Sequence, residues 1–250
     1  MAPSPRMRDT AIVLIPARLQ ATRLPGKPLA DIGGVPMIVH VWRRAVAANV
    51  GPVVVACEDE GIAAAVRAAG GVAEFTGAHH RSGSDRITEA LGRLDPGKKK
   101  YGIVVNLQGD LPTIEPAVVA AVLEPLADPA VSIATLARPL SDGELANPNV
   151  VKAHAALSAA RPIAHATAFT REGASCRGDC FHHIGIYAYR RAALERFVSL
   201  PPSANERAHS LEQLRAVDDG MVIGVRLVDT DSFGVDTPAD LARARAALSP

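Results

Sequence analysis

Short apolar runs alternate with amphipathic segments through the first half of the chain. The runs are rich in β-branched residues, which is typical of buried strands, and they cover residues 11–15, 52–57, 72–76 and 102–107. Between them, apolar residues recur at helical spacing over 36–48, 59–69 and 84–94. Strands that are separated by helices predict an α/β fold with a mainly parallel sheet and helices on both faces.

The second half of the chain loses this regular alternation. Polar linkers that contain proline now separate the apolar runs, which predict strands at 131–136, 150–155, 184–189 and 222–228. Helices are predicted at 191–199, at 205–218 and from Thr237-Pro238 onward, where a capping hydroxyl precedes a proline. Because no repeat and no long linker divides the chain, we predict one domain over residues 11–250, with a small inserted lobe at about 135–220 and a flexible terminus over 1–10.

The composition excludes several classes of function. The 250 residues carry a net charge of only +1, so no global basic field attracts nucleic acid or a membrane surface. Aromatic residues make up 4%, too few for a base-stacking platform. No apolar run reaches the roughly 18 residues that a membrane span needs, and the polar start does not fit a signal peptide, so we expect a cytoplasmic protein.

A basic loop follows the first predicted strand. Pro16 ends the apolar run, and Arg18, Arg23 and Lys27 follow it closely. Arginine and lysine match phosphate oxygens, and ligands of open α/β sheets collect at the carboxyl ends of strands. We therefore interpret the loop as a polyphosphate site; the alternative is a solvated basic turn that binds nothing.

Two aspartates occupy similar positions far apart in the sequence. Asp110 follows the strand at 102–107 and a glycine, and Asp236 follows Gly234-Val235 directly before the last helix. Carboxylates in such positions suit Mg²⁺, which binds through one or two carboxylates together with substrate phosphates. Taken alone, Asp236 is better explained as a helix cap, so the metal interpretation requires the two aspartates to converge.

The stretch HHRSGSDR, residues 79–86, is a second polar cluster. Ser82 and Gly83 offer hydroxyl and backbone donors to a base or sugar just before a predicted helix. The alternative is that Ser84 is only the cap of that helix.

The cysteines allow two interpretations. Three of them, Cys57, Cys176 and Cys180, are an odd number, which points away from a disulfide framework. Cys176 and Cys180 also precede His182-His183 in a spacing that suggests zinc. Because adjacent histidines rarely bind one ion together, a structural zinc site is not predicted here.

Taken together, the motifs resemble the 3-deoxy-manno-octulosonate cytidylyltransferase (CMP-Kdo synthetase) family. They occur in the family's order from about residue 11 to residue 248, as PARLQATRLPGKPL, HHRSGSDR, NLQGDLP, NPNVVK, HHIGIYAYR, LEQLR and GVDTPADL. The resemblance implies a nucleotide-binding sheet that is Rossmann-like and GT-A-like. It also implies a magnesium-dependent homodimer that joins CMP from CTP to the sugar acid Kdo, with release of pyrophosphate, for lipopolysaccharide biosynthesis.

The resemblance further implies roles for individual residues. The CTP ligands are Arg18, Arg23, Lys27, Ser82 and Gly83. The magnesium ligands are Asp110 and Asp236, which count as catalytic together with Arg18 and Lys27. The residues expected around the sugar acid are Gln108, His183, Tyr187, Glu212 and Gln213.

Most departures from the family pattern lie in the part of the sequence that is expected to bind the sugar acid. His165 stands where an arginine, a natural partner of the sugar carboxylate, is usual, and His209 stands where a glutamate is common. These departures leave two alternatives open: transfer of CMP to another acid, such as 8-amino-Kdo or a sialic-acid-like sugar, or a nucleotide-binding homologue without activity. A dinucleotide-dependent oxidoreductase is disfavoured, because the first strand lacks a G-x-G-x-x-G turn.

Overall fold

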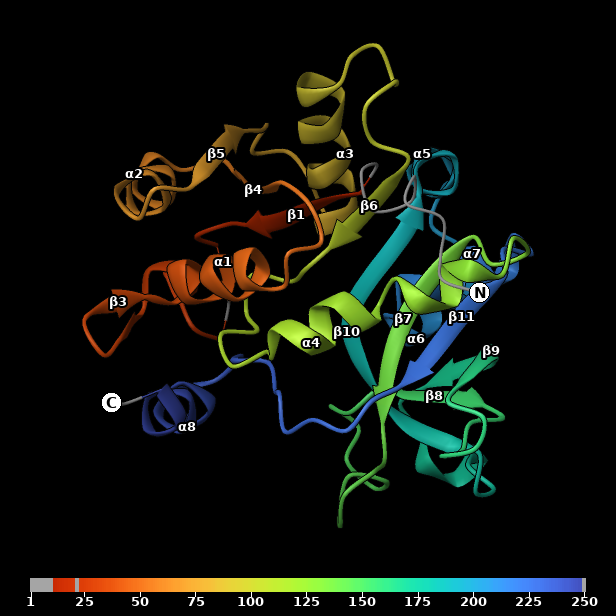
Figure 1. Cartoon of the computed structure of the whole chain (residues 1–250). Helices are drawn as coiled ribbons and strands as arrows, with labels where there is room; N and C mark the ends of the chain where they lie inside the picture. The colour runs from red at the N-terminus through yellow and green to blue at the C-terminus, as the bar shows by residue number, and fades with distance from the viewer. Residues whose placement is uncertain (1–10, 21–22, 249–250) are drawn as a thin grey trace. The chain divides into compact units, whose positions relative to one another are not determined.

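The computed structural model describes residues 11–20 and 23–248, so the predicted flexible terminus at 1–10 lies outside the described residues. The chain forms two compact units (Figure 1). The first unit contains the residues up to 120 together with 231–250, and the second contains residues 121–230. The inserted lobe that was predicted at about 135–220 falls within the second unit.

Four parallel strands form the sheet of the first unit, in the order β5-β4-β1-β6. They are β1 (Ala11–Ala17), β4 (Val53–Cys57), β5 (Val72–Phe75) and β6 (Ile103–Asn106). Strand β1 is central, with Val13 paired to Val53 of β4 on one side and to Val105 of β6 on the other. A parallel sheet is covered on both faces, and this explains why β1 is apolar and buried almost throughout.

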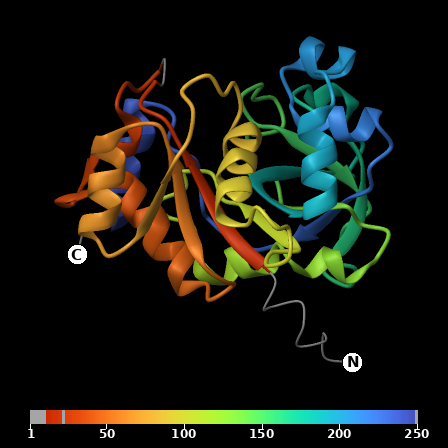
Figure 2. The same cartoon turned by 90° about the horizontal axis from the view of Figure 1, so that it is seen from above.

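Helices α1 (Met37–Ala47), α2 (Glu60–Ala68) and α3 (Gly83–Leu94) contact this sheet. Helix α4 (Pro116–Ala121) lies at the end of the unit's first segment, and α8 (Pro238–Leu248) contacts β2 (Asp31–Ile32). The short elements η2 (Lys27–Leu29), β2 and β3 (Val35–Pro36) precede α1. Figure 2 shows α3 in yellow against β1 in red, in agreement with their contacts. Helix α8 buries Leu241 and Ala244 against Ile32, Met37 and Val235, which fixes the end of the chain to this unit.

The sheet of the second unit is mixed, in the order β10-β7-β11-β9-β8. Its strands are β7 (Ile133–Arg138), β8 (Lys152–Ala155), β9 (Ile163–Thr170), β10 (Cys180–Arg190) and β11 (Ile223–Leu227). Only β7 and β11 pair in parallel, and β10 also pairs with β8, so the pairings form a ring. The expected mainly parallel sheet therefore holds for the first unit and is wrong for the second. A short loop without a crossover helix joins β8 to its antiparallel neighbour β9, as such a connection allows.

The remaining elements of the second unit are short. They are η3 (Glu124–Ala127), η4 (Gly173–Ser175), α5 (Arg191–Ser199), α6 (Ala204–His209) and α7 (Gln213–Asp218). The helix predicted over 205–218 is thus two helices, because Ser210 adopts a left-handed conformation with φ of 52°. Cys176 and Cys180 form a disulfide, which corrects the expectation from the odd cysteine count. Among the described helices, none combines the length and the apolar character needed to cross a membrane.

Candidate functional site

Lys27 is held at the start of η2, beyond the carboxyl end of β1. Gly26 precedes it with φ of 70°, a left-handed conformation that glycine adopts without strain. The Lys27 side chain is only 15% exposed, whereas that of Arg23 is 60% exposed. Arg18, directly after β1, is also exposed. The predicted polyphosphate loop therefore has one largely buried cation and two arginines that face solvent.

Both predicted metal-binding aspartates contact the Lys27 ammonium. Nζ of Lys27 donates to Oδ2 of Asp110 at 2.8 Å and to Oδ1 of Asp236 at 3.0 Å. Arg23 pairs with the other carboxylate oxygen of Asp236, also at 3.0 Å. The predicted convergence of two aspartates from distant parts of the sequence is therefore confirmed, and it occurs around the basic loop.

Close backbone packing brings Asp110 to this position. A Cβ atom at Gly109 would lie 2.8 Å from the Pro16 carbonyl oxygen, so only glycine allows the loop after β6 to lie so close to the end of β1. The Val235 N–H donates to the Asp110 carbonyl oxygen at 2.9 Å. That hydrogen bond joins the segment before α8 to the Asp110 loop and places Asp236 beside it.

Asp236 does not cap the last helix. Thr237 and Asp240 perform that function: the Asp240 N–H donates to the Thr237 hydroxyl at 3.2 Å, and the Thr237 hydroxyl donates to the Asp240 carboxylate at 2.8 Å. The backbone N–H of Asp236 also donates to Asp240, at 3.1 Å. The capping alternative for Asp236 is thus excluded, and its carboxylate is directed to the two cations.

The charge state of Lys27 follows from this environment. Burial lowers the pKa of Lys27, but the charges and hydrogen bonds of Asp110 and Asp236 outweigh burial, so the pKa is raised above its ordinary value. Lys27 therefore stays protonated near neutral pH. It can act as a fixed positive charge, but not as a proton acceptor.

Ser82 and Gly83 lie beside the same end of β1. A Cβ atom at Gly83 would meet the Pro16 ring at 3.0 Å and the Gln108 amide oxygen at 3.7 Å. Ser82, rather than Ser84, is the N-cap of α3, because its hydroxyl accepts from the Asp85 N–H at 3.1 Å. The first unit therefore brings together the basic loop, Ser82-Gly83, Gln108 and both aspartates.

Two pairs that the sequence reasoning missed, one with a buried arginine and one partly buried, support this stretch. Arg86 is 2% exposed, pairs with Glu58 and donates to the Thr76 hydroxyl at 2.6 Å. His80 is hydrogen-bonded to Glu89, and this bond lowers the pKa of the Glu89 carboxyl group. Both pairs fix the segment 79–86 to its neighbours.

In the second unit, His183 and Tyr187 lie on one face of the sheet. Residues 185–186 form an irregularity in β10, so that His183 pairs with Ala137 and Tyr187 with Thr135 of β7. The His183 and Tyr187 ring centroids are 5.4 Å apart. The Thr135 hydroxyl lies 2.9 Å from Nε2 of His183 and 2.7 Å from the Ile186 carbonyl oxygen. Because that carbonyl can only accept, Thr135 donates to it and accepts from Nε2, which leaves Nδ1 of His183 as an acceptor.

Burial keeps this pair of side chains neutral. Burial, together with the neighbouring His182, lowers the pKa of His183 to about 3. Burial, with smaller contributions from Tyr189 and Glu212, raises the pKa of Tyr187 well above its ordinary value. The cluster therefore offers uncharged donors and acceptors, with the Glu212 carboxylate near Tyr187.

Glu212 and Gln213 are positioned by the turn between α6 and α7. Glu212 is the residue directly before α7, and Gln213 begins it and is 8% exposed. Arg215 fixes α7 to α6 through Glu206, with contacts of 2.6 and 2.8 Å. The Arg215 guanidinium also lies 4.7 Å from the centre of the Phe197 ring. Arg215 of the LEQLR motif thus has a structural role.

His165 is on the opposite face of the sheet from His183. Val225 of β11 pairs with Thr135 and with Ala164, which places Ala164 on the Thr135 face and its neighbour His165 on the other. There, Nε2 of His165 lies 3.0 Å from Oδ2 of Asp128, and both side chains are about half exposed. This position does not support His165 as a replacement for the usual arginine that would bind the sugar carboxylate. His209, at the end of α6, is exposed.

The sequence reasoning missed Thr135, although a signal was present. Thr135 is a fully buried polar residue within a strand that is otherwise apolar up to its last residue, Arg138. A hydroxyl in such a run requires a hydrogen-bond partner, and here the partners are the His183 ring and the β10 backbone.

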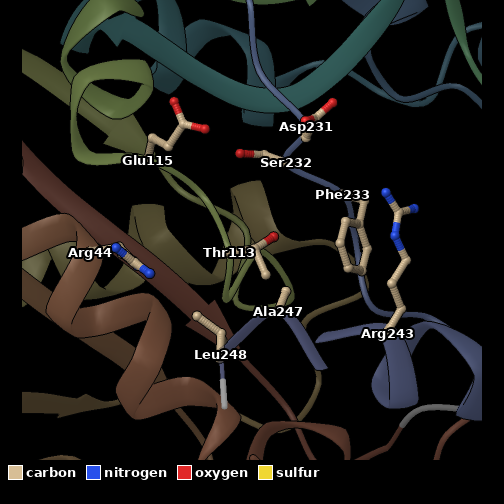
Figure 3. Close-up of a pocket in the computed structure, with 9 residues that line it drawn as sticks. All are labelled: Arg44, Thr113, Glu115, Asp231, Ser232, Phe233, Arg243, Ala247 and Leu248. Atoms are coloured by element: carbon tan, nitrogen blue, oxygen red, sulfur yellow. The ribbon is translucent and has the colours of Figure 1, made fainter. Parts of the chain in front are cut away.

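A small cavity of about 250 Å³ lies elsewhere in the first unit (Figure 3). Its described lining residues are Arg44, Thr113, Glu115, Asp231, Ser232, Phe233, Arg243, Ala247 and Leu248. The Arg243 guanidinium stacks on Phe233 with 3.8 Å to the ring centroid, which anchors the segment before Asp236 to α8. None of the predicted site residues is among these lining residues, so we assign the cavity no part in the site.

Comparisons with known proteins give a consistent picture. The model of the cytidylyltransferase family matches residues 12–223. The chain is 54% identical to a 3-deoxy-manno-octulosonate cytidylyltransferase from Paramagnetospirillum magneticum, over 96% of this chain and 98% of that protein. It is 60% identical to a protein of the same name from Rhodopseudomonas palustris strain BisA53, over 96% of this chain and 97% of that protein.

A solved structure is similar over nearly the whole chain. It is the structure of CMP:2-keto-3-deoxy-manno-octonic acid synthetase complexed with CTP, and it superposes with a TM-score of 0.84 at 41% sequence identity. The alignment covers 96% of this chain and 98% of that chain. The likeness therefore extends through both units and includes the segment that carries Asp236, which lies beyond the match to the family model.

Proposed function

Given that the chain belongs to the family of 3-deoxy-manno-octulosonate cytidylyltransferases, we propose that it transfers CMP from CTP to 3-deoxy-manno-octulosonate (Kdo) and releases pyrophosphate. The product supplies Kdo for lipopolysaccharide biosynthesis. The observation that carries the proposal is the contact of one ammonium group, that of Lys27, with both Asp110 and Asp236.

The first unit binds the nucleotide. Lys27 and the two exposed arginines Arg18 and Arg23 supply positive charge for the triphosphate, since guanidinium and ammonium groups are the usual phosphate partners. Ser82 and Gly83, next to Pro16 at the start of α3, supply hydrogen-bond donors for the cytidine part of CTP. Four parallel strands support a Rossmann-like and GT-A-like arrangement for this unit.

Magnesium fits the aspartate pair. Oxygens of Asp110 and Asp236 lie 2.8 and 3.0 Å from the same nitrogen atom, so a single cation can contact both carboxylates. Mg²⁺ prefers oxygen ligands and is usually held by one or two carboxylates together with substrate phosphates. Asp110 and Asp236 would therefore hold the ion. When bound, it supplies charge neutralisation at the phosphates and lowers the pKa of an attacking hydroxyl.

The reaction is a displacement at phosphorus. The oxygen of the anomeric hydroxyl forms a new bond to the α-phosphorus of CTP, and its proton passes to solvent water. The bond from that phosphorus to the bridging oxygen breaks, and pyrophosphate leaves with the bonding electrons. Lys27 keeps its proton because its pKa is raised, so it stabilises the leaving phosphates as a fixed charge. Arg18 and Arg23 add donors to the same oxygens as charge builds up on them.

The second unit binds the sugar acid. A sugar with several hydroxyl groups needs both donors and acceptors, and the neutral His183, the neutral Tyr187 and the Glu212 carboxylate provide them. Gln213 at the start of α7 adds an amide. Gln108, in the first unit, lies next to Gly83. We assign it to binding of the sugar acid because of its position in the Q-G-D motif.

The family resemblance also implies a homodimer, and we place the reaction in the cytoplasm, where CTP is available. Light scattering on the purified protein tests the dimer directly. We expect a mass of twice the 26.1 kDa of one chain, and a mass equal to one chain would contradict the dimer.

The proposed function is tested by measuring pyrophosphate release with a panel of substrates. We expect turnover with CTP and Kdo in the presence of Mg²⁺, and loss of turnover when the metal is chelated. UTP and ATP in place of CTP, and 8-amino-Kdo and sialic acid in place of Kdo, serve as comparisons. A clear preference for one of the other acids would contradict the acceptor assignment, whereas CTP binding without turnover on any acid would indicate a homologue without activity.

A further inference from the structure

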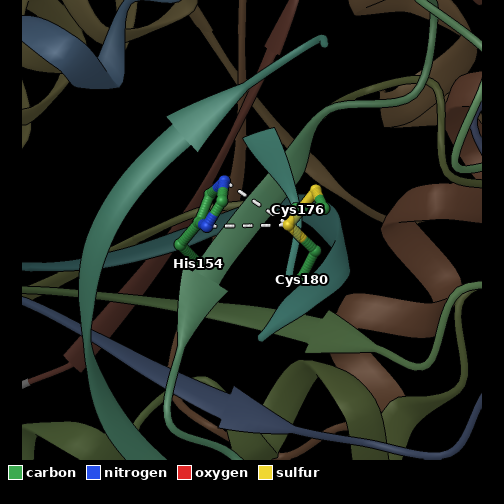
Figure 4. Close-up of side chains that lie close together, drawn as sticks. All are labelled: His154, Cys176 and Cys180. Atoms are coloured by element: carbon green, nitrogen blue, oxygen red, sulfur yellow. Dashed lines mark hydrogen bonds between the residues drawn. A yellow bond between two sulfur atoms is a disulfide. The ribbon is translucent and has the colours of Figure 1, made fainter. Parts of the chain in front are cut away.

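His154 lies against the Cys176–Cys180 disulfide in the second unit (Figure 4). His154 comes from β8, Cys180 begins β10, and Cys176 follows η4. The His154, Cys176 and Cys180 ligand atoms all lie within 4.8 Å of one another. None of these three residues takes part in the reaction described above.

The imidazole of His154 lies between a carboxylate and the Cys180 sulfur. Nδ1 of His154 lies 3.2 Å from Oδ2 of Asp179, and Nε2 lies 3.4 Å from Sγ of Cys180. His154 is 8% exposed. A carboxylate on one ring nitrogen fixes the tautomer, so that Asp179 holds the Nδ1 proton and the lone pair of Nε2 is left for a metal ion. This is the outer-sphere arrangement that accompanies zinc-bound histidines.

The ligand atoms are already near one another, although they are not yet arranged around an ion. Zn–S bonds of about 2.3 Å and Zn–N bonds of about 2.0 Å, at a tetrahedral angle, separate sulfur and nitrogen by about 3.5 Å. Nε2 of His154 lies 3.4 Å from the Cys180 sulfur, but Nδ1 lies at a similar 3.6 Å, so the sulfur is beside the ring and the imidazole must turn to direct Nε2 at an ion. A cysteine pair within the spacing common in zinc sites, together with one histidine, is a recognised ligand set.

We propose that Cys176, Cys180 and His154 form a zinc site when the disulfide is reduced, with Asp179 orienting the histidine. A dithiol reductant transfers two electrons and two protons to the disulfide and is itself oxidised to a disulfide. Zinc binding then releases the two thiol protons and takes the neutral imidazole as its third ligand. A water molecule completes the coordination.

Two chemical arguments favour zinc as the occupant. Disulfides rarely persist in the cytoplasm, where paired cysteines more often bind metal. The reduced state of Cys176 and Cys180 therefore depends on the cytoplasmic location proposed above. Thiolate ligands select soft or borderline ions, which excludes the magnesium used at Asp110 and Asp236. The two metal sites are therefore chemically distinct, and failure of one leaves the other unaffected.

The test measures metal binding by the full chain rather than its activity. The protein is reduced with a water-soluble phosphine without oxygen, desalted, and titrated with Zn²⁺ in competition with a coloured chelator and, separately, with Co²⁺. We expect one tightly bound equivalent of Zn²⁺ in the reduced protein and none in the oxidised protein. With Co²⁺, we expect the near-ultraviolet band that thiolate coordination produces. Absence of that band and of the bound equivalent in the reduced protein would overturn the proposal.

Variants separate the ligands from their neighbours. Cys176→Ser, Cys180→Ser and His154→Gln should each lose the tight equivalent, and Asp179→Asn should weaken binding about 10- to 100-fold. His182→Gln is the matched control and should bind as the parent does, because His182 contacts Glu144 instead. Circular dichroism shows whether each variant is folded. Unchanged binding by folded His154→Gln, or loss with His182→Gln alone, would contradict the assignment.

Discussion

The two units hold their functional residues by different physical means. In the first, a buried ammonium joins two carboxylates, with Lys27 at 2.8 Å from Asp110 and 3.0 Å from Asp236. In the second, burial removes charge: the pKa of His183 falls to about 3 and that of Tyr187 rises. Charged groups suit a triphosphate and a divalent ion, whereas neutral donors and acceptors suit sugar hydroxyls. Substitutions in the two units should therefore have separable effects on the two substrates.

The largest effect is expected from the aspartates of the first unit. Asp110→Asn or Asp236→Asn should reduce kcat about 100- to 1000-fold, because each removes a preorganised charge partner at the reacting phosphate. CTP should still bind, through Lys27 and the arginines. Pyrophosphate release at saturating Mg²⁺ and calorimetric titration of CTP measure the two quantities. Glu60→Gln, an exposed carboxylate of the same unit that pairs only with Arg67 among described residues, is the control and should leave kcat unchanged.

A smaller effect, confined to the sugar acid, is expected from the second unit. Tyr187→Phe keeps the ring and its packing on His183 but removes the hydroxyl. We expect the KM for Kdo to rise about tenfold, which corresponds to the loss of one hydrogen bond, while the KM for CTP is unchanged. Steady-state kinetics with each substrate varied in turn measures both constants. An equal rise in the KM for Kdo and the KM for CTP would contradict separate effects of the two units on the two substrates.

The neutral state of His183 predicts a stability change with pH. The folded protein does not protonate His183 until pH about 3, whereas the unfolded chain binds that proton near pH 6.5. Protonation therefore favours unfolding as the pH falls below about 6.5. We expect this residue to cost about 1.3 kcal/mol of stability between pH 7 and pH 5.5.

Urea unfolding at the two pH values measures this cost. His183→Gln should lose about 1.3 kcal/mol less than the parent over that interval. The exposed His209 provides the control, and His209→Gln should retain the pH dependence of the parent. An identical pH dependence in parent and His183→Gln would show that His183 is not buried as a neutral group.

The smallest effect is expected from His165. Because it lies on the sheet face opposite to His183 and pairs with Asp128, His165→Arg should change the KM for Kdo by less than about twofold. A marked tightening of Kdo binding would place His165 in the acceptor site after all. Steady-state kinetics with the Kdo concentration varied measures this KM in the parent and in His165→Arg.

The first unit follows from sequence patterns more directly than the second. Its strands are parallel and buried, so their apolar runs are visible, and chemistry at their carboxyl ends can be expected to converge. Lys27 and Asp110 illustrate this, since each follows an apolar run that predicts a strand, whereas Asp236 follows only Gly234-Val235. Only the roles of these residues remain predictions.

The second unit depends on pairings that no local pattern reveals. Strand β9 was not predicted, because its alternation of small and polar residues gives a weak signal. Without β9, the face on which His165 lies could not be deduced. Without the pairing of β8 with β10, His154 could not be placed next to Cys180. These relations depend on strand register, which long-range packing determines.

The central claim is that Asp110 and Asp236 together hold a divalent cation. The most direct measurement uses Mn²⁺ in place of Mg²⁺ and follows its binding to the protein with CTP present by electron paramagnetic resonance. We predict protein-bound Mn²⁺ in the parent and a loss of most of that signal in Asp110→Asn/Asp236→Asn, with CTP still bound. Equal Mn²⁺ binding by the parent and the double variant would contradict the claim.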